Sequence, residues 1–325
     1  MSLLPLDIST VRQLRESLGD AIVTTPVTRV WALEEALGDG TRVQAKLELL
    51  QRTGTFKARG ALATLKGLPA SRLAAGVTAV SAGNHAIATA YAAAAVGTSA
   101  KVVMIRKANP ARLEACRAHG AEVVLADDVH AAFELAERIQ REEGRYLVHP
   151  FEGEAVAAGT GTLGLEIAEQ CGDIEVLVVT IGGGGLIGGI ANVFKQLRPA
   201  VEIIGVEPEG ADTMHRSFAA GEPRGIDEVR TIADSLGAPF AMPYSFALCR
   251  KNVDRLVKVS DDALRQAMGF MFRYMKLAVE PACAASTAAV LGPLREALAG
   301  RSVAVLLCGS NVDWPTFAAQ VRFDD

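Results

Sequence analysis

Short apolar runs that alternate with stretches of helical periodicity constrain the fold of this chain more than any other feature. The runs are unbroken and rich in valine and isoleucine, as is typical of strands in a parallel sheet covered on both faces. They occupy residues 78–80, 101–105, 121–125, 146–148, 175–181, 202–206 and 302–307. Helical periodicity marks residues 86–96, 110–119, 128–143, 155–171 and 261–276. This alternation predicts an α/β fold built on open, mostly parallel sheets with right-handed crossovers.

The domain organisation is harder to read, because composition does not shift along the chain. Residues 69–150 contain four strand–helix alternations, which are enough for a small sheet of their own, and the remainder would form a larger one. The length of 325 residues fits about two domains of roughly 150 residues each. We therefore expect two α/β units.

Composition and charge exclude several classes of protein. Hydrophobic residues make up 50% of the chain and charged residues 22%, so the chain is neither collagen-like nor a disordered polyelectrolyte. The net charge of −4, with lysine and arginine scattered, provides no basic stripe for nucleic acid or an anionic membrane. Five widely spaced cysteines form no disulfide framework and no CxxC zinc motif, and the N-terminus lacks the pattern of a signal peptide. We therefore expect a cytoplasmic protein that binds neither nucleic acid nor a membrane.

Four segments of unusual chemistry each begin where a predicted strand ends. Ligands of open α/β sheets bind beyond the carboxyl ends of the strands, so these segments predict one composite binding site. They contain Ser81, Ala82, Gly83, Asn84 and His85; Gly182, Gly183, Gly184 and Gly185; Glu207; and Cys308.

The four consecutive glycines predict a phosphate site. Without side chains the backbone can approach an anion closely, and a helix beginning near Leu186 would present free N–H groups and the positive end of its dipole. A simple turn is the plain alternative. A dinucleotide site is another, because residues 183–188 fit the spacing G-x-G-x-x-G and Glu207 stands where the ribose-binding acid would be. The spacing alone leaves all three interpretations open.

Lys57 is a candidate nucleophile, in the segment TGTFKARG of residues 53–60. Most lysines are solvated surface charges. A lysine that loses water next to another cation, here Arg59, has a lowered pKa and can act as a nucleophile or a base. For His85 a packed or hydrogen-bonded role is the simpler interpretation, and Asn84 alone could be a helix cap.

Taken together, these segments resemble the fold-type-II pyridoxal-phosphate enzymes, and within them the serine/threonine dehydratase and serine racemase family. The resemblance rests on eight motifs that follow in that family's order. They are residues 53–61 (TGTFKARGA), 81–86 (SAGNHA), 149–151 with 159–162 (HPF and GTGT), 182–185 (GGGG), 205–208 (GVEP), 231–234 (TIAD), 279–282 (VEPA) and 308–311 (CGSN). The resemblance implies a tryptophan synthase β-like fold with a small mobile domain, residues 71–150, inserted in a large cofactor-binding domain, residues 1–70 and 151–325. It also implies a homodimer.

The resemblance further implies roles for individual residues. Lys57 would bind pyridoxal 5′-phosphate covalently and, once released, take the α-proton of the substrate as a neutral amine. Asn84 would hydrogen-bond the ring 3′-oxygen, Phe56 would pack against the ring, and Cys308 would face the ring nitrogen. The glycines Gly182, Gly183, Gly184 and Gly185 would hold the phosphate with Leu186, and backbone N–H groups of Ser81, Ala82, Gly83, Asn84 and His85 would receive the substrate carboxylate.

These roles imply dehydration and deamination of a β-hydroxy amino acid, L-threonine or L-serine first, to a 2-oxo acid and ammonia. A thiol at Cys308 would leave the ring nitrogen largely neutral, which favours β-elimination over transamination. Racemases of the family carry serine where Ala82 stands, so alanine favours dehydration. Serine racemization and 3-hydroxyaspartate dehydration stay open as alternatives. So do a nucleotide-dependent oxidoreductase and a catalytically silent binding protein.

Departures from the family concern the substrate and a metal. Ser235 and Cys283 replace glycines near the expected substrate side, which leaves the identity of the substrate open. Many relatives bind a divalent cation through a glutamate, a backbone carbonyl and an aspartate. Glu207 and Ala211 match the first two, but Thr213 stands at the aspartate position, with Asp212 as the available substitute. We therefore expect a weak cation site at best.

Overall fold

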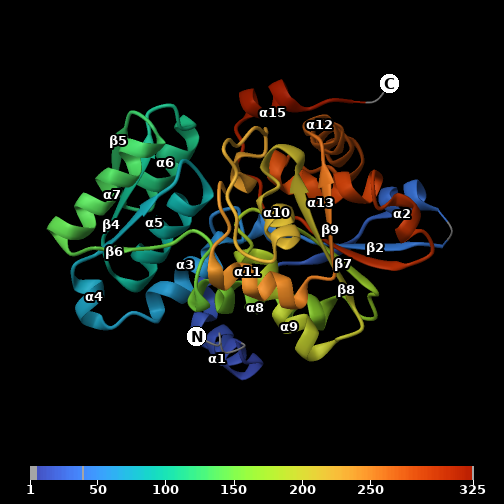
Figure 1. Ribbon diagram of the computed structural model, residues 1–325, viewed down its shortest axis with the longest axis horizontal. Helices are drawn as coiled ribbons and strands as arrows, with labels where there is room; N and C mark the ends of the chain where they lie inside the picture. Colours follow the sequence, from blue (N-terminus) through green and yellow to red (C-terminus); the bar gives the residue numbers. More distant parts are fainter. Residues whose placement is uncertain (1–5, 39, 324–325) are drawn as a thin grey trace.

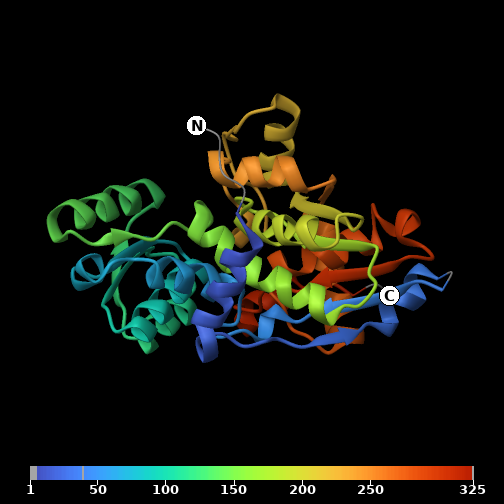
Figure 2. The same cartoon turned by 90° about the horizontal axis from the view of Figure 1, so that it is seen from below.

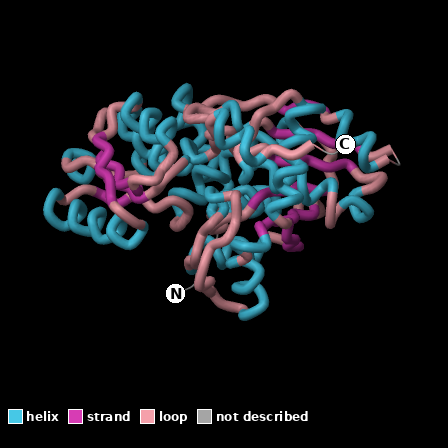
Figure 3. The backbone as a smooth tube through the Cα atoms, turned by 90° about the horizontal axis from the view of Figure 1, so that it is seen from above, coloured by secondary structure: helices cyan, strands magenta, loops and turns pink. Residues whose placement is uncertain are grey.

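Two sheets lie side by side along the long axis of the molecule, each flanked by helices (Figures 1 and 2). The structure is a computed structural model, which describes residues 6–38 and 40–323. The tube in Figure 3 shows the strands as two separate groups, each embedded in helices. The chain is therefore an α/β protein with two sheets, as the alternation of strands and helices predicts.

The smaller sheet has four parallel strands in the order β5-β4-β3-β6. It comes from one continuous stretch of chain, which agrees with the four alternations expected in residues 69–150. Its strands are β3 (Val77–Val80), β4 (Ala100–Ile105), β5 (Glu122–Ala126) and β6 (Tyr146–Leu147). Its helices are α4 (Ala70–Ala74), α5 (Asn84–Val96), α6 (Pro110–Ala118) and α7 (Val129–Glu143).

The larger sheet has six strands in the order β1-β2-β10-β7-β8-β9, parallel except for β1. Its strands are β1 (Val27–Arg29), β2 (Arg42–Lys46), β7 (Val176–Thr180), β8 (Glu202–Pro208), β9 (Arg255–Val259) and β10 (Ser302–Leu306). The helices of this part are α1 (Ile8–Leu18), α2 (Trp31–Leu37), α3 (Lys57–Lys66), α8 (Glu154–Gln170), α9 (Gly185–Leu197), α10 (Thr213–Ala220), α11 (Pro243–Asn252), α12 (Asp261–Phe270), α13 (Pro281–Leu291), α14 (Arg295–Leu298) and α15 (Trp314–Gln320). Four short 3₁₀ turns lie at η1 (Gly19–Ala21), η2 (Glu48–Leu50), η3 (Glu209–Ala211) and η4 (Asp234–Leu236).

Three strands, β1, β2 and β9, carry no apolar run and are not predicted from the sequence. β1 and β9 lie at the two edges of the larger sheet, where one side of a strand faces solvent. β2 lies inside the sheet but contains Lys46, whose side chain is fully buried. The Lys46 amine donates to the carboxylate of Glu166 on α8 at 2.6 Å. A charged residue can therefore occupy a central strand when a buried partner neutralises it.

The predicted helix 261–276 is interrupted. α12 ends at Phe270, and a π-helix, η5 (Met271–Met275), follows. The segment ends at Lys276, which has a φ of 62°, in the left-handed region. The apolar period continues through the π turn, so periodicity alone does not reveal the change. Among the described residues, no helix has the length and apolar character needed to cross a bilayer.

Candidate active site

One pocket gathers residues from four of the segments that the sequence singles out. Lys57, Asn84, Cys308 and the glycine loop, defined as residues 182–185, all line it, together with Phe56 and Leu186. Phe151, Ser235 and Glu280 complete much of its wall. Asn84 is the one residue of the segment 81–85 that lines this pocket, and Glu207 lies elsewhere, in the contacts described below. The lysine motif, the glycine loop, Asn84 and Cys308 therefore lie around one pocket.

Lys57 is the first residue of α3 and reaches into this pocket. Its amine donates to the carbonyl oxygen of Pro150 at 2.5 Å and lies 5.1 Å from the ring centroid of Phe56. Loss of water lowers the pKa of the Lys57 amine to about 8, although Cys308 and the Glu280 carboxylate oppose this shift. A substantial fraction of the amine is therefore neutral near physiological pH.

Arg59 does not lower this pKa, contrary to the prediction. Its guanidinium is fully buried and points away into an ion cluster, where Nε donates to Glu48 at 2.5 Å and Nη1 lies 2.7 Å from Glu166. Residues two positions apart lie on different faces of a helix, so the charge of Arg59 is directed elsewhere. Burial, and not a neighbouring cation, lowers the pKa of Lys57.

Asn84 begins α5, but its side chain does not cap that helix. The N-cap position belongs to Gly83, which has no side chain to cap the helix. The Asn84 amide instead donates to both oxygens of Glu280, at 2.8 and 3.0 Å, and accepts from Nδ2 of Asn311 at 2.9 Å. A buried amide with both ends bonded has one orientation. Asn84 is therefore held in the pocket by tertiary contacts.

The loop 81–83 leads into α5, whose first residue, Asn84, lines the pocket. The backbone N–H of Gly83 donates to the hydroxyl of Ser81 at 3.1 Å, and the helix that follows has 13 residues. The imidazole of His85 is buried and donates from Nε2 to the carbonyl of Val148 at 2.8 Å. Burial and the Lys57 charge lower the pKa of His85 to about 3. His85 is a neutral, packed histidine, as its simpler interpretation predicts, and not a base.

The glycine loop leads directly into α9, which begins at Gly185 and has 13 residues. Gly184 has a φ of +89°, and a Cβ there would lie 2.7 Å from the methyl carbon of Met214. A Cβ on Gly183 would lie 2.2 Å from the ring of Phe151. The loop is also tied to α8, because the hydroxyl of Thr160 donates to the carbonyl of Gly185 at 2.7 Å. Glycine is thus required by packing as well as by any bound anion.

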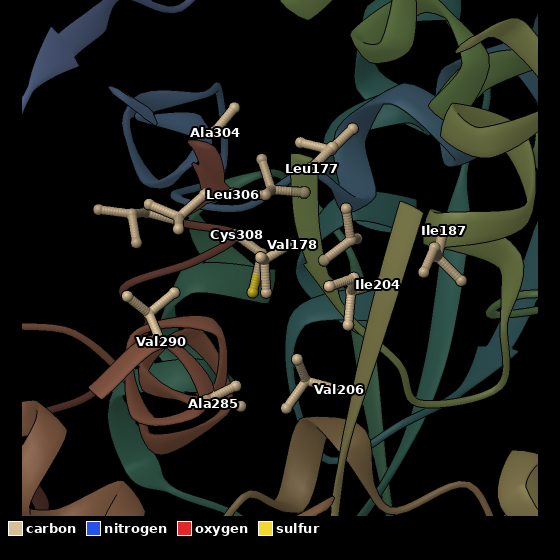
Figure 4. Close-up of a cluster of buried hydrophobic side chains, with 14 of the residues drawn as sticks. Leu177, Val178, Ile187, Ile204, Val206, Ala285, Val290, Ala304, Leu306 and Cys308 are labelled. Atoms are coloured by element: carbon tan, nitrogen blue, oxygen red, sulfur yellow. The ribbon is translucent and has the colours of Figure 1, made fainter. Parts of the chain in front are cut away.

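Cys308 follows β10 and is almost fully buried at 2% exposure. Figure 4 shows its sulfur in the apolar cluster with Val178 of β7 and Ala285 of α13. The hydroxyl of Thr180 lies 3.7 Å from the sulfur, and the Cys283 thiol is a second hydrogen-bonding neighbour that Cys308 helps to keep protonated. Cys308 therefore belongs both to the buried apolar cluster and to the wall of the pocket.

Glu280, Asn311 and Arg112 are site residues whose roles the sequence does not reveal. Glu280 lies in the motif of residues 279–282 and Asn311 in that of residues 308–311, but neither motif shows a contact with Asn84. Burial raises the pKa of Glu280 to about 7. Arg112 lies on α6, and the sequence alone does not distinguish it from a surface arginine of an amphipathic helix. Its contacts with Glu280 and Asp234 depend on how the two sheets meet.

The proposed cation residues are already bonded to protein groups. Glu207 is fully buried and accepts from the backbone N–H of Met214 at 2.7 Å and from Nδ1 of His215 at 2.6 Å. Asp212 accepts from Arg216 and Lys258. Across residues 6–38 and 40–323, no group of three or more histidine, cysteine, aspartate or glutamate residues could hold a metal ion. The carboxylate of Glu207 is also not available for a ribose, which removes the main support for a dinucleotide site.

The chain matches a family model described as pyridoxal-phosphate-dependent enzyme over residues 18–309. It belongs to this family. A phenylserine dehydratase of Ralstonia pickettii is 54% identical over 312 residues, which cover 96% of this chain and 95% of that protein. An L-threonine ammonia-lyase of Thermotoga maritima is 36% identical, over 95% of this chain and 76% of that protein. The structure of maize serine racemase superposes with a TM-score of 0.92 at 32% identity, and the match covers 97% of this chain and 96% of that one.

Membership in the pyridoxal-phosphate family confirms the family and fold expected from the motifs and excludes the nucleotide-dependent oxidoreductase. The residues present also fit the cofactor. The first N–H groups of α9 have no partner within the helix and, with the glycine loop, form an anion site on the pocket wall. An amine of lowered pKa, an amide and a thiol face the same pocket. Pyridoxal phosphate requires these groups: a lysine, a phosphate cradle and polar contacts to its ring.

Proposed function

We propose that this protein dehydrates and deaminates a β-hydroxy amino acid with pyridoxal phosphate, giving a 2-oxo acid and ammonia. One observation carries the proposal: the Lys57 amine, with its pKa lowered to about 8, shares a pocket with the glycine loop at the start of α9. A phosphate site next to a partly neutral amine suits a cofactor that is bound at both ends.

The chain's own residues have distinct tasks in this proposal. Lys57 binds the cofactor and, when neutral, takes the α-proton of the substrate. The glycine loop and Leu186 would hold the phosphate, Phe56 would pack on the ring, Asn84 would bond the 3′-oxygen, and Cys308 would face the ring nitrogen. When bound, pyridoxal phosphate supplies an electron-withdrawing ring that makes the α-hydrogen acidic. The backbone of Ser81, Ala82, Gly83, Asn84 and His85 binds the substrate carboxylate at the start of α5.

A β-hydroxy amino acid with an aryl side chain is the first substrate to test. The relative at 54% identity is a phenylserine dehydratase, and the pocket wall includes the ring of Phe151 and the side chain of Leu236. Apolar and aromatic walls favour an apolar ligand group. L-Threonine and L-serine, the substrates expected from the sequence, are tested beside it.

A substrate panel tests the proposal directly. Release of 2-oxo acid and ammonia is measured with L-phenylserine, L-threonine, L-serine and L-3-hydroxyaspartate, with L-phenylalanine as the control that lacks a β-hydroxyl. We expect turnover of β-hydroxy amino acids, highest kcat/KM for phenylserine, and none of phenylalanine. No 2-oxo acid from any β-hydroxy amino acid would overturn the proposal.

We also propose that the protein is a homodimer. Exposed aromatic side chains gather on one surface around η5 and α15: Phe272, Tyr274 and Trp314 are 42%, 55% and 70% exposed. Phe272 contacts Phe317 and Phe323, and Trp314 contacts Phe317, so the rings of Phe272, Trp314 and Phe323 form one cluster. Large exposed apolar patches are typical of protein interfaces. Sedimentation analysis of the wild type and of Phe272→Asp tests this; a monomeric wild type would contradict it.

Two further proposals concern motion and location. On one face of the smaller sheet, Val103, Ala126, Ala132, Ala136 and Ile139 form an apolar cluster drawn only from residues 71–150, which supports a small mobile domain of residues 71–150 inserted between residues 1–70 and 151–325. Small-angle scattering with and without substrate tests this movement.

The five cysteines are free and buried, which fits a reducing cytoplasm, and cell fractionation tests this location.

A further inference from the structure

Four residues, Asn84, Glu280, Arg112 and Asn311, form a closed ring of polar contacts that joins the parts of the fold around the two sheets. The Asn84 amide nitrogen donates to Glu280, and its oxygen accepts from Asn311. Nε of Arg112 donates to the backbone oxygen of Asn311 at 3.2 Å, and Nη2 lies 3.6 Å from Oε2 of Glu280. Arg112 therefore closes the ring from the side opposite to Asn84.

The four members of this ring come from four separate places in the fold. Arg112 lies on α6 and Asn84 on α5, both beside the smaller sheet, whereas Glu280 precedes α13 and Asn311 follows β10. Arg112 is 11% exposed, and its Nη1 also donates to Asp234 at 2.6 Å. The same nitrogen would be 3.0 Å from a Cβ on Gly83, so the guanidinium also borders the loop 81–83.

We propose that Arg112 is a positioning residue for the reaction: through Glu280 and Asn311 it fixes the Asn84 amide in one orientation toward the pocket. This inference rests on the proposed function, because the orientation of Asn84 matters only if cofactor and substrate bind there. Arg112 reaches neither the Lys57 amine nor the glycine loop among the contacts of the structure, so it acts through its neighbours.

The physical reason lies in the burial of Glu280, whose side chain is 2% exposed. An ionised carboxylate accepts from Asn84 with both oxygens, whereas a protonated one has an O–H to donate, which lets the amide turn over. Arg112 and Lys57 favour the ionised form, while burial and Asp234 favour the protonated form. The remaining titratable neighbour is Cys283 on α13. Loss of Arg112 therefore moves the balance toward protonated Glu280 and a less defined Asn84.

The structure offers a matched control on the same helix. Nδ2 of Asn109 donates to Asp313 at 2.7 Å, which is a second bond between α6 and the segment after β10. Asn109 also caps α6 through its side-chain oxygen. Asn109→Ser keeps a capping oxygen but is too short to reach Asp313. It breaks a contact between the two parts of the fold without touching the ring.

The experiment compares Arg112→Gln, Arg112→Lys and Asn109→Ser in the full chain. Cofactor affinity is measured by titrating the apoprotein with pyridoxal phosphate across neutral pH, and kcat and KM are measured on the substrate found in the panel. For Arg112→Gln we expect a loss of cofactor affinity and of kcat/KM of roughly 10- to 100-fold. We also expect the decline in affinity at low pH to begin at a higher pH than in the wild type. Arg112→Lys should recover most of the loss, and Asn109→Ser should stay within about twofold.

Two outcomes would overturn the inference. One is wild-type affinity and pH profile in Arg112→Gln. The other is an equal loss in Arg112→Gln and Asn109→Ser with an unchanged pH profile, which would show that α6 only docks the two parts. Asn311→Ala gives a second arm: it removes no charge, so it should weaken cofactor binding without moving the pH profile, and unchanged binding would count against the ring. If the wild type turns over no β-hydroxy amino acid, the proposed function fails, while the apoprotein titration still decides the role of Arg112.

Discussion

The backbone N–H of Phe56 donates to the carbonyl oxygen of Cys308 at 3.2 Å. An isolated bridge between Thr55 and Gly309 lies beside this bond. The residue that precedes the lysine is thereby joined to the end of β10, at the far end of the chain. This pairing brings the Lys57 amine and the Cys308 thiol into one pocket.

Lys57→Ala should lower turnover by roughly 10⁴-fold or more and abolish the visible absorbance of the lysine-bound cofactor, because one side chain is both anchor and base. The fold should persist, since a buried amine is removed and no partner is left charged. Lys66→Ala, at the exposed end of the same helix, is the control. Near-normal deamination in Lys57→Ala would eliminate this mechanism.

Gly184→Asp should weaken cofactor binding at least tenfold, because a carboxylate would enter the phosphate site and a Cβ would press on Met214. Gly97→Asp is the matched control: Gly97 also has a positive φ, of +74°, but open space around it. Both variants carry the backbone strain and the charge. Equal cofactor titrations for the two would reject the phosphate assignment.

Dehydration of L-serine should exceed racemization, because Ala82 has no proton to donate to the second face of the α-carbon. Lys57 then removes and returns a proton on one face only. Pyruvate and D-serine are measured in the same reaction, for the wild type and for Ala82→Ser. D-serine as the main wild-type product would refute the expectation, and a rise of D-serine in Ala82→Ser would support it.

Cys308→Ser should retain most activity, because a hydroxyl is also a neutral hydrogen-bonding group. Cys308→Asp should differ, since a carboxylate favours a protonated ring nitrogen. We expect slower elimination and an additional long-wavelength absorbance band with substrate. An Asp variant that folds, binds cofactor and turns over like the parent, with no new band, would show that Cys308 is only a buried apolar residue.

The apoprotein should lose stability as the pH falls from about 6.5 toward 3, because folded His85, with its pKa lowered to about 3, stays neutral while the unfolded chain takes up a proton. The slope from this group is at most about 1.4 kcal/mol per pH unit. Glu280, whose pKa is raised to about 7, acts in the opposite direction, since its protonation favours the folded state. Urea unfolding of His85→Gln should show a shallower acid-side loss than the wild type. Parallel curves for the two proteins would contradict this account.

Much of the fold follows from the sequence. The runs that become β3, β4, β7, β8 and β10 are continuous and apolar because both faces of those strands are buried, and such runs stand out in any sequence. β1 and β9 lie at edges and β2 buries Lys46 against Glu166, so their residues look polar until their neighbours are known. The apolar spacing of the sequence continues from α12 into η5, so the sequence does not reveal the π turn there.

The site divides in the same way. The sequence by itself determined the family, the lysine motif, the glycine loop and the end of β10, because each depends on residue types at short spacing. Only the tertiary structure decided that Arg59 turns away from Lys57, that Glu207 is bonded within the protein, and that Asn84 lies between Glu280 and Asn311. Such contacts join residues far apart in the chain, and their partners are set by how helices and the two sheets pack. No local pattern of residues carries that information.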